Sequence, residues 1–173
     1  GVGAKITQTP FTVYISGIDT YGAISRTSRS DVNIIAVVDP QNRKILLTST
    51  PRDYYVPLPT KNNALDKLTH AGNYGVDASM KTLEQLYDVD LNYYVRVNFT
   101  SLMGMVDALG GITVESPKAF KSYTGEYYFT AGLNELNGEE ALAFSRERYA
   151  FAAGDNLRGL NQMAVIKAMM DKA

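Results

Sequence analysis

Two aspartates stand beside strand-like segments, where their carboxylates could hold a divalent cation. Asp19 follows the apolar stretch Phe11 to Ile18, and Asp31 precedes the stretch Val32 to Val38. Mg²⁺ is typically held by one or two carboxylates together with phosphate oxygens of a substrate and water. Asp19 and Asp31 are therefore the predicted metal ligands. An aspartate in a turn more often accepts a hydrogen bond from a backbone amide, so each needs support from its surroundings.

Arginines accompany these acids. Arg29 precedes Asp31 in the tripeptide Arg29-Ser30-Asp31, and Arg52 follows the stretch Lys44 to Thr50. A guanidinium group is planar, stays charged and binds phosphate in a bidentate manner. Two acids with several arginines suit phosphoryl transfer better than hydrolysis of a sugar or a peptide. The pattern predicts a site for a phosphate-containing substrate.

A second basic cluster lies near the C-terminus. Arg146 and Arg148 are two residues apart, so they share a face of an extended segment but diverge by about 200° on a helix. If both contact one phosphate group, the preceding helix must end near Ser145. Arg158 and Gln162 are four apart and share a face of the last predicted helix. The alternative for each residue alone is a solvated surface charge.

The elements that must position these groups begin with three β-rich stretches. They cover residues 11–18, 32–38 and 44–50, and the turn Asp39-Pro40-Gln41-Asn42 joins the last two as an antiparallel hairpin. If the three strands run up, down and up, their ends bring Asp19, Asp31, Arg29 and Arg52 to one edge of the sheet.

The rest of the chain alternates helical and strand patterns. Helical character is expected over residues 65–73, 77–86, 100–109 and 156–172 and in a helix that begins at Asn137. Thr100 is the expected cap and Gly110-Gly111 the expected end of the third of these. Strands are expected over residues 93–99 and 112–114, with short ones at 120 and 127–129. The predicted fold is an α/β, three-layer α-β-α sandwich with a mixed central sheet. Residues 1–10 are expected to be an artificial start and lead-in, and residues 11–173 a single catalytic domain.

Composition limits the possible functions. Of 173 residues, 45% are hydrophobic and 20% charged, which is ordinary for a globular domain. The net charge of −1 provides no general basic field, so nucleic acid is not an expected partner. Cysteine is absent, which excludes disulfides, thiolate metal sites and a cysteine nucleophile.

Seven sequence blocks, in this order, resemble the LytR–CpsA–Psr family of Gram-positive cell-envelope enzymes over essentially the whole chain. The greatest similarity is to streptococcal members that act on capsular polysaccharide. The blocks are Gly17-Ile18-Asp19, Arg29-Ser30-Asp31, Pro51-Arg52-Asp53, Lys67-Leu68-Thr69-His70-Ala71, Asp107-Ala108-Leu109-Gly110-Gly111-Ile112, Phe144-Ser145-Arg146-Glu147-Arg148 and Asp155 through Gln162.

The resemblance implies an enzyme on the extracytoplasmic face of the membrane, held by an N-terminal anchor that precedes this chain. It implies transfer of a glycan, capsular polysaccharide or teichoic acid, from a polyprenyl pyrophosphate carrier onto peptidoglycan. The polyprenyl tail would lie in an apolar tunnel between sheet and helices. By the same resemblance Asp19 and Asp31 hold Mg²⁺, and Arg52 and Asp31 act in catalysis. The residues implied to bind pyrophosphate are Arg29, Arg52, Lys67, Arg146, Arg148, Arg158 and Gln162.

Two other functions fit the same residues. One is a module that binds the lipid-linked anion without chemistry, although paired carboxylates would repel phosphate unless a cation intervenes. The other is a pyrophosphatase with water as the acceptor. The general base is open between Asp31 and Asp53, because His70, the single histidine, is more typical of a structural role.

Overall fold

The structure of the protein is a computed structural model that describes residues 9–122, 124–147 and 155–172. For residues 155–159 it describes only the backbone. The chain divides after Asn98 into two compact units, Gly1–Asn98 and Phe99–Ala173. The single domain expected for residues 11–173 stays a prediction.

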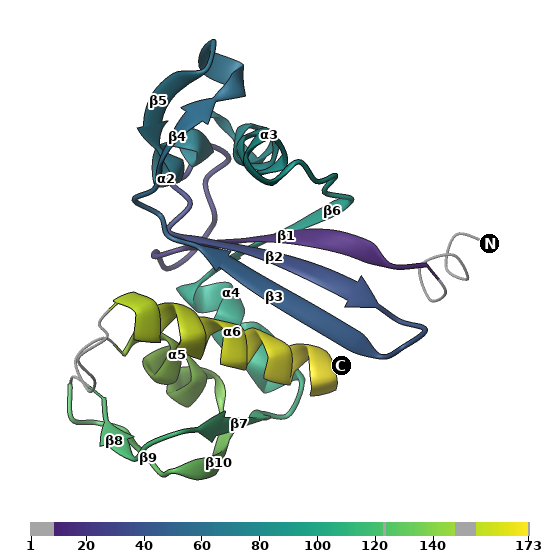
Figure 1. Ribbon diagram of the computed structural model, residues 1–173. Coiled ribbons are helices and arrows are strands. Elements are labelled where there is room, and N and C mark those ends of the chain that lie inside the picture. The colour runs from purple at the N-terminus through teal and green to yellow at the C-terminus, as the bar shows by residue number, and fades with distance from the viewer. Residues whose placement is uncertain (1–8, 123, 148–154, 173) are drawn as a thin grey trace. The chain divides into compact units, whose positions relative to one another are not determined.

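A four-stranded mixed sheet forms the centre of the first unit (Figure 1). It consists of β1 (Phe11–Ile18), β2 (Val32–Asp39), β3 (Lys44–Thr50) and β6 (Tyr93–Asn98), in the order β3-β2-β1-β6. β1 runs antiparallel to β2 and parallel to β6, and β2 runs antiparallel to β3. The predicted α/β class with a mixed sheet is therefore confirmed.

One face of this sheet carries the core of the first unit. The elements packed there are the hairpin of β4 (Tyr55–Leu58) and β5 (Ala64–Lys67), α2 (Leu68–Ala71) and α3 (Val76–Tyr87), with short 3-10 turns at Pro59–Lys61 and Gly72–Tyr74 (Figure 1). Tyr14 and Ile35 from the sheet pack with Val56, Leu68 and Leu83 from these elements. The sheet is therefore braced by the segment that follows Arg52 in the chain.

The helix expected over residues 65–73 is wrong at its start. Residues 64–67 form β5, paired with the unpredicted strand β4, whereas Leu68–Ala71 is α-helical and Gly72–Tyr74 is a 3-10 turn. The backbone amides of Leu68 and Thr69 donate to the carbonyls of Tyr54 and Arg52, at 2.8 and 2.9 Å. These long-range bonds hold the segment extended up to Lys67. A short apolar pattern does not reveal such bonds.

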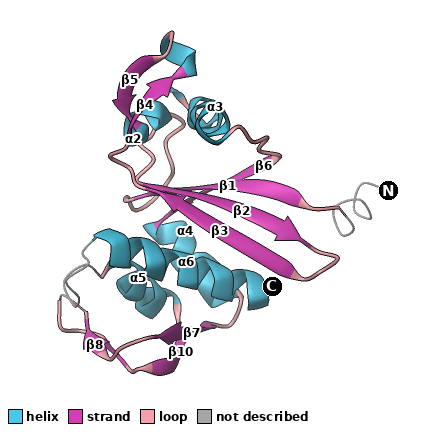
Figure 2. Cartoon of the chain, viewed as in Figure 1, coloured by secondary structure: helices cyan, strands magenta, loops and turns pink. Residues whose placement is uncertain are grey.

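The second unit combines three helices with short strand pairs (Figure 2). Its elements are α4 (Phe99–Ala108), β7 (Ile112–Ser116), β8 (Phe120–Lys121), β9 (Tyr128–Phe129), β10 (Gly132–Leu136), α5 (Gly138–Arg146) and α6 (Asp155–Lys172). β7 pairs with β10 and β8 with β9, both antiparallel. The rings of Phe120, Phe129 and Phe144 pack together, with centroids 5.0–5.6 Å apart, at the centre of this unit's core.

Helix ends in the second unit follow the expected turn chemistry with one exception. Asn137 caps α5 in a capping box. Its side chain accepts a hydrogen bond from the backbone amide of Glu140, and the Glu140 side chain accepts one from the backbone amide of Asn137. Gly110 and Gly111 follow α4 with positive φ values of 77° and 90°. Thr100 is not the cap of α4, because that helix already begins at Phe99. No helix within the described residues is both long and apolar enough to cross a bilayer.

Candidate functional site

Three strand ends of the central sheet meet at one edge. Gly17 near the end of β1 pairs with Val32 at the start of β2, and Asn33 pairs with Thr50 at the end of β3. The antiparallel order predicted for these strands is therefore confirmed. It brings Asp19, Asp31 and Arg52 to the same edge from separate parts of the chain.

Asp31 is the centre of this arrangement. Its Oδ1 lies 2.8 Å from Nη1 of Arg52, and its Oδ2 accepts a hydrogen bond from the backbone amide of Asp19, also at 2.8 Å. Its own amide donates to the carbonyl of Gly17 at 2.8 Å. The Asp31 side chain is only 10% exposed and that of Arg52 33% exposed. Because the pair is partly buried, solvent and salt screen its attraction less than that of an exposed ion pair.

Gly17 explains why the edge can close so tightly. A Cβ atom on Gly17 would lie 2.7 Å from Cβ of its cross-strand neighbour Val32, closer than real side chains approach. A larger residue would separate the ends of β1 and β2. The glycine in Gly17-Ile18-Asp19 therefore has a packing role that supports the acid two residues later.

A buried polar network underlies the Arg29–Asp31 segment, and the sequence reasoning missed it. It consists of Tyr14, Ser16, Ser30 and Asn33, each at most 3% exposed. The Tyr14 hydroxyl donates to Oδ1 of Asn33 at 2.6 Å and lies 2.9 Å from Oγ of Ser30. Burial raises the pKa of the Tyr14 phenol, opposed in part by the Ser30 and Ser16 hydroxyls, so the phenol stays protonated as a donor. The sequence signal that could have revealed this network is the presence of polar residues at inward-facing strand positions.

Other polar groups of the first unit are more exposed. Arg29 lies on the surface, whereas its neighbour Ser30 is buried. Nζ of Lys67 lies 3.6 Å from Oδ1 of Asp53, and these side chains are 52% and 64% exposed. His70 is not isolated, because its Nδ1 lies 2.7 Å from Oδ1 of Asp66. The hydrogen bond to His70, and then that from the Lys67 amide, lowers the pKa of the Asp66 carboxyl.

The remaining predicted ligands belong to the second unit. Arg146 is the last residue of α5, and Glu147 after it is extended, so the helix ends close to the position predicted. The Arg146 guanidinium lies over the Phe99 ring, 4.5 Å from its centroid. Glu147, which sequence reasoning did not single out, is only 2% exposed. Gln162 is half-buried on α6.

Two predicted ligands fall outside what the structure describes. Arg148 lies outside the described residues, and Arg158 belongs to α6 but only its backbone is described. Convergence of the second unit's residues with Asp19, Asp31 and Arg52 stays a prediction, as do the roles assigned to all of them.

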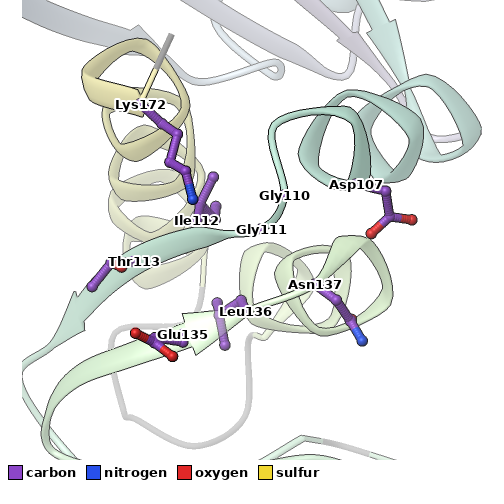
Figure 3. Close-up of a pocket in the computed structure, with 9 residues that line it drawn as sticks. All are labelled: Asp107, Gly110, Gly111, Ile112, Thr113, Glu135, Leu136, Asn137 and Lys172. Atoms are coloured by element: carbon purple, nitrogen blue, oxygen red, sulfur yellow. The ribbon is translucent and has the colours of Figure 1, made fainter.

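A pocket of about 360 Å³ lies in the second unit. Figure 3 shows Lys172 from α6 reaching toward β7, with Thr113 and Glu135 on the paired strands and Asp107 and Asn137 near the helix ends. Oδ1 of Asp107 accepts the amide of Gly138, at the first residue of α5, at 2.8 Å. The block Asp107 to Ile112 therefore joins α4 to β7 and caps α5, and no predicted site residue lines this pocket.

The acids at the sheet edge fit the minimal donor set expected for Mg²⁺. Each carboxylate oxygen offers two lone pairs, so Asp31, with one oxygen in a hydrogen bond and the other in an ion pair, keeps capacity for a cation. Within the described part of the chain, no three acidic or histidine side chains form a metal-binding group. A cation at Asp19 and Asp31 would therefore need phosphate oxygens or water to complete its coordination.

The model of the LytR_cpsA_psr family matches residues 3–173. The chain belongs to this family. The matched range includes Asp19, Asp31 and Arg52 as well as the C-terminal arginines.

Relatives of the chain include proteins named as transferases. The chain is 40% identical over 166 residues to the polyisoprenyl-teichoic acid–peptidoglycan teichoic acid transferase TagU of Enterococcus faecalis, covering 94% of this chain and 54% of that protein. The crystal structure of B. subtilis TagU superposes with a TM-score of 0.78 at 36% identity, over 95% of this chain and 67% of that one. A family structure, TagT with bound octaprenyl pyrophosphate, gives a TM-score of 0.74 at 34% identity, over 94% and 64%.

The chain spans about half the length of the curated relatives it matches. The family and the fold are shared over nearly the whole chain. The reported relatives are named for teichoic acid, and the expected similarity to members acting on capsular polysaccharide stays a prediction.

Proposed function

We propose that this protein transfers a glycan from a polyprenyl pyrophosphate carrier onto peptidoglycan. Relatives that share 34–40% of its residues are named as transferases of teichoic acid to peptidoglycan, with a polyisoprenyl-linked donor. A solved relative carries octaprenyl pyrophosphate. These enzymes support both the donor class and the acceptor class.

The observation that carries the proposal is the position of Asp31 between Asp19 and Arg52. One carboxylate contacts both the neighbouring acid's backbone and a guanidinium group, each at 2.8 Å. A guanidinium has five N–H donors, so Arg52 retains donors for a phosphate while one nitrogen faces Asp31. Anion and cation ligands therefore stand side by side, as binding of a metal-bound diphosphate requires.

Asp19 and Asp31 are the proposed ligands of Mg²⁺. When bound, the cation would neutralise charge on the pyrophosphate oxygens and stabilise the leaving phosphate. Arg52 and Arg29 are the proposed phosphate-binding residues of the first unit, with Lys67 as a weaker contributor. From the second unit we assign Arg146, Arg148, Arg158 and Gln162, on the basis of the family blocks.

The proposed reaction conserves atoms and charge. A hydroxyl oxygen of peptidoglycan attacks the phosphorus atom that carries the glycan, forming a new phosphodiester bond. The bond between that phosphorus and the bridging oxygen breaks, and polyprenyl phosphate leaves with the bridging oxygen. The hydroxyl proton passes to a base, and Arg52 stabilises the charge on the phosphoryl oxygens.

Asp31 and Asp53 are the candidates for the base. One oxygen of Asp31 already accepts a hydrogen bond and the other is in an ion pair with Arg52, whereas Asp53 is 64% exposed and faces Lys67 at 3.6 Å. If Asp53 is the base, Asp53→Asn lowers kcat and removes the acidic limb of the pH–rate profile. If Asp31 is the base, Asp53→Asn leaves that limb unchanged.

The apolar face of the central sheet is the proposed contact for the polyprenyl tail. Side chains on the face opposite Tyr14 are apolar along neighbouring strands, including Val13, Ile15, Ile34 and Val95. A photoreactive prenyl pyrophosphate should crosslink to these strands. Crosslinks confined to other segments would contradict this placement.

The names of the relatives favour teichoic acid as the cargo, with capsular polysaccharide as the alternative. Since peptidoglycan is the acceptor, we place the enzyme on the extracytoplasmic face of the cell membrane. The membrane anchor expected from the family resemblance is part of this proposal.

A reconstituted reaction tests the proposal. The purified chain is incubated with a prenyl-pyrophosphate-linked glycan, Mg²⁺ and peptidoglycan fragments, and the products are separated by mass. A phosphodiester-linked glycan on peptidoglycan, with prenyl phosphate released, supports transfer. Release of glycan phosphate without acceptor modification would instead identify a pyrophosphatase, and binding without turnover a binding module.

A further inference from the structure

The buried hydroxyl of Ser30 joins the Arg29–Asp31 segment to the interior of the first unit. Oγ of Ser30 lies 2.9 Å from the Tyr14 hydroxyl, 2.8 Å from Oγ of Ser16 and 2.7 Å from Oδ1 of Asn33. It also lies 3.1 Å from the carbonyl oxygen of Val32. A hydroxyl donates one hydrogen bond and accepts two, so these four contacts exceed its capacity, and the carbonyl oxygens of Asn33 and Val32 share the single Ser30 hydrogen.

Ser30 lies between Arg29, a proposed phosphate-binding residue, and Asp31, a proposed ligand of Mg²⁺. Arg29 precedes it on the surface, and Asp31 follows it at the sheet edge. The Nδ2 of Asn33 donates to the Ser30 carbonyl at 3.2 Å, and the Ser30 amide donates to the carbonyl of Thr69 at 3.2 Å. Side chain and backbone of Ser30 are therefore both fixed from within the unit.

Because these hydrogen bonds are buried, breaking one of them is costly. Tyr14 is fully buried, and Ser30 and Asn33 are each 1% exposed. In such an interior a broken hydrogen bond is not replaced by solvent, so a partner left unsatisfied shifts or costs free energy. A rotation of Ser30 would also move the Asp31 carboxylate that meets Arg52.

We propose that Tyr14 and Asn33 are positioning residues, which act through Ser30 to orient Asp31 toward Asp19 and Arg52. The inference rests on the proposed function, because it assigns the network a part in aligning the site for phosphoryl transfer. Both residues are buried, so they would act without contacting the substrate. Their effect is to keep Asp31 within 2.8 Å of both partners.

The test compares Tyr14→Phe and Ser30→Ala with a matched control on the same strand. Thr12 lies toward the other end of β1, where its hydroxyl donates to the carbonyl of Asp90 at 2.6 Å. Thr12→Val removes that hydrogen bond at similar volume. Urea unfolding, steady-state transfer kinetics and a crystal structure are recorded for all four proteins, the unmodified chain included.

Tyr14→Phe and Ser30→Ala should lower kcat by about tenfold or more, since a displacement of about 1 Å can cost a hundredfold. KM for the lipid-linked donor should change less than kcat, and Thr12→Val should alter neither, even where its unfolding free energy falls. In the Ser30→Ala crystal structure, Asp31 should be displaced from Arg52 or from the Asp19 amide.

Two results would overturn the inference. One is a kcat for both variants within about twofold of the unmodified chain, well below the effect expected of a misplaced group. The other is an Asp31 carboxylate unmoved in the Ser30→Ala structure. If the unmodified chain performs no transfer, the proposed function fails, and the crystallographic displacement alone then decides whether the network positions Asp31.

Discussion

The carboxylate of Asp31 accepts the backbone amide of Asp19 at 2.8 Å, although the two residues are twelve positions apart. This bond joins the end of β1 to the start of β2, and the ion pair with Arg52 extends the same contact to the residues that follow β3. One partly buried carboxylate thereby connects three segments. Its removal should affect both stability and function.

Asp31→Asn should lower the free energy of unfolding by about 1–2 kcal/mol, because the ion pair and charged acceptor are lost at a partly buried site. Asp53→Asn is the matched control. Its ion pair with Lys67 spans 3.6 Å between exposed side chains, so its loss should cost at most about 1 kcal/mol. Urea unfolding at neutral pH measures both. Equal losses would show that burial of the Asp31 pair adds nothing.

Gly72 supports the Arg29–Asp31 segment from the side of α2. A Cβ atom at Gly72 would lie 2.3 Å from the carbonyl oxygen of Ser28 and 2.8 Å from the amide of Ser30. Gly72→Ala should therefore destabilise the fold by about 1–3 kcal/mol through overpacking, and lower the transfer rate.

Gly104 provides the control for this substitution. It lies in α4, and a Cβ there meets nothing within 4 Å. Gly104→Ala should raise stability by about 0.5–1 kcal/mol through helix propensity. Thermal unfolding of the two variants should thus shift in opposite directions. A Gly72→Ala protein as stable as the unmodified chain would contradict the close packing at Ser28 and Ser30.

The Asp66–His70 pair predicts a specific pH dependence. The hydrogen bond from His70 lowers the pKa of Asp66 below its ordinary value of 3.8, so the ionised carboxylate stabilises the folded state. This stabilisation is fully present at pH values above the ordinary pKa and is lost as the pH falls through the lowered pKa of the folded state. The stability difference between the unmodified chain and Asp66→Asn should be constant from pH 5 to 6 and shrink in stronger acid. A difference that grows with acidity would have the wrong sign.

Asp19→Ala tests the proposed cation site. Without this carboxylate the transfer rate should fall and no longer rise with added Mg²⁺. Titration calorimetry of Mg²⁺ in the presence of farnesyl pyrophosphate gives a second readout. The heat of Mg²⁺ binding seen with the unmodified chain should be absent in Asp19→Ala. Unchanged Mg²⁺ stimulation and an unchanged heat would remove Asp19 from the metal site.

Much of the sheet edge was predictable because its determinants are local. β-branched and aromatic runs locate β1, β2 and β3, and a four-residue turn fixes the β2–β3 hairpin. From that order the meeting of Asp19, Asp31 and Arg52 follows by geometry. A helix end near Ser145 was expected if Arg146 and Arg148 contact one phosphate, and α5 ends at Arg146, while that shared contact stays a prediction.

What sequence reasoning missed depends on contacts between distant segments. Strand β4 and the conversion of residues 64–67 into β5 rest on pairing that no local pattern specifies. The Tyr14–Ser30–Asn33 network needs the register of β1 against β2, because only then do these polar side chains face one interior. His70 has a hydrogen-bond partner in Asp66, which precedes it by four residues but lies in β5 and not in the same helix.

The most direct measurement is the affinity of the chain for farnesyl pyrophosphate and farnesyl monophosphate in Mg²⁺, with Arg52→Ala and Arg52→Lys beside the unmodified protein. We expect tighter binding of the pyrophosphate, a preference that is lost in Arg52→Ala and partly kept in Arg52→Lys. The transfer rate of Arg52→Ala should fall by the equivalent of about 2–4 kcal/mol of transition-state stabilisation. Equal affinities for the two lipids, or near-normal binding and transfer by Arg52→Ala, would contradict this expectation.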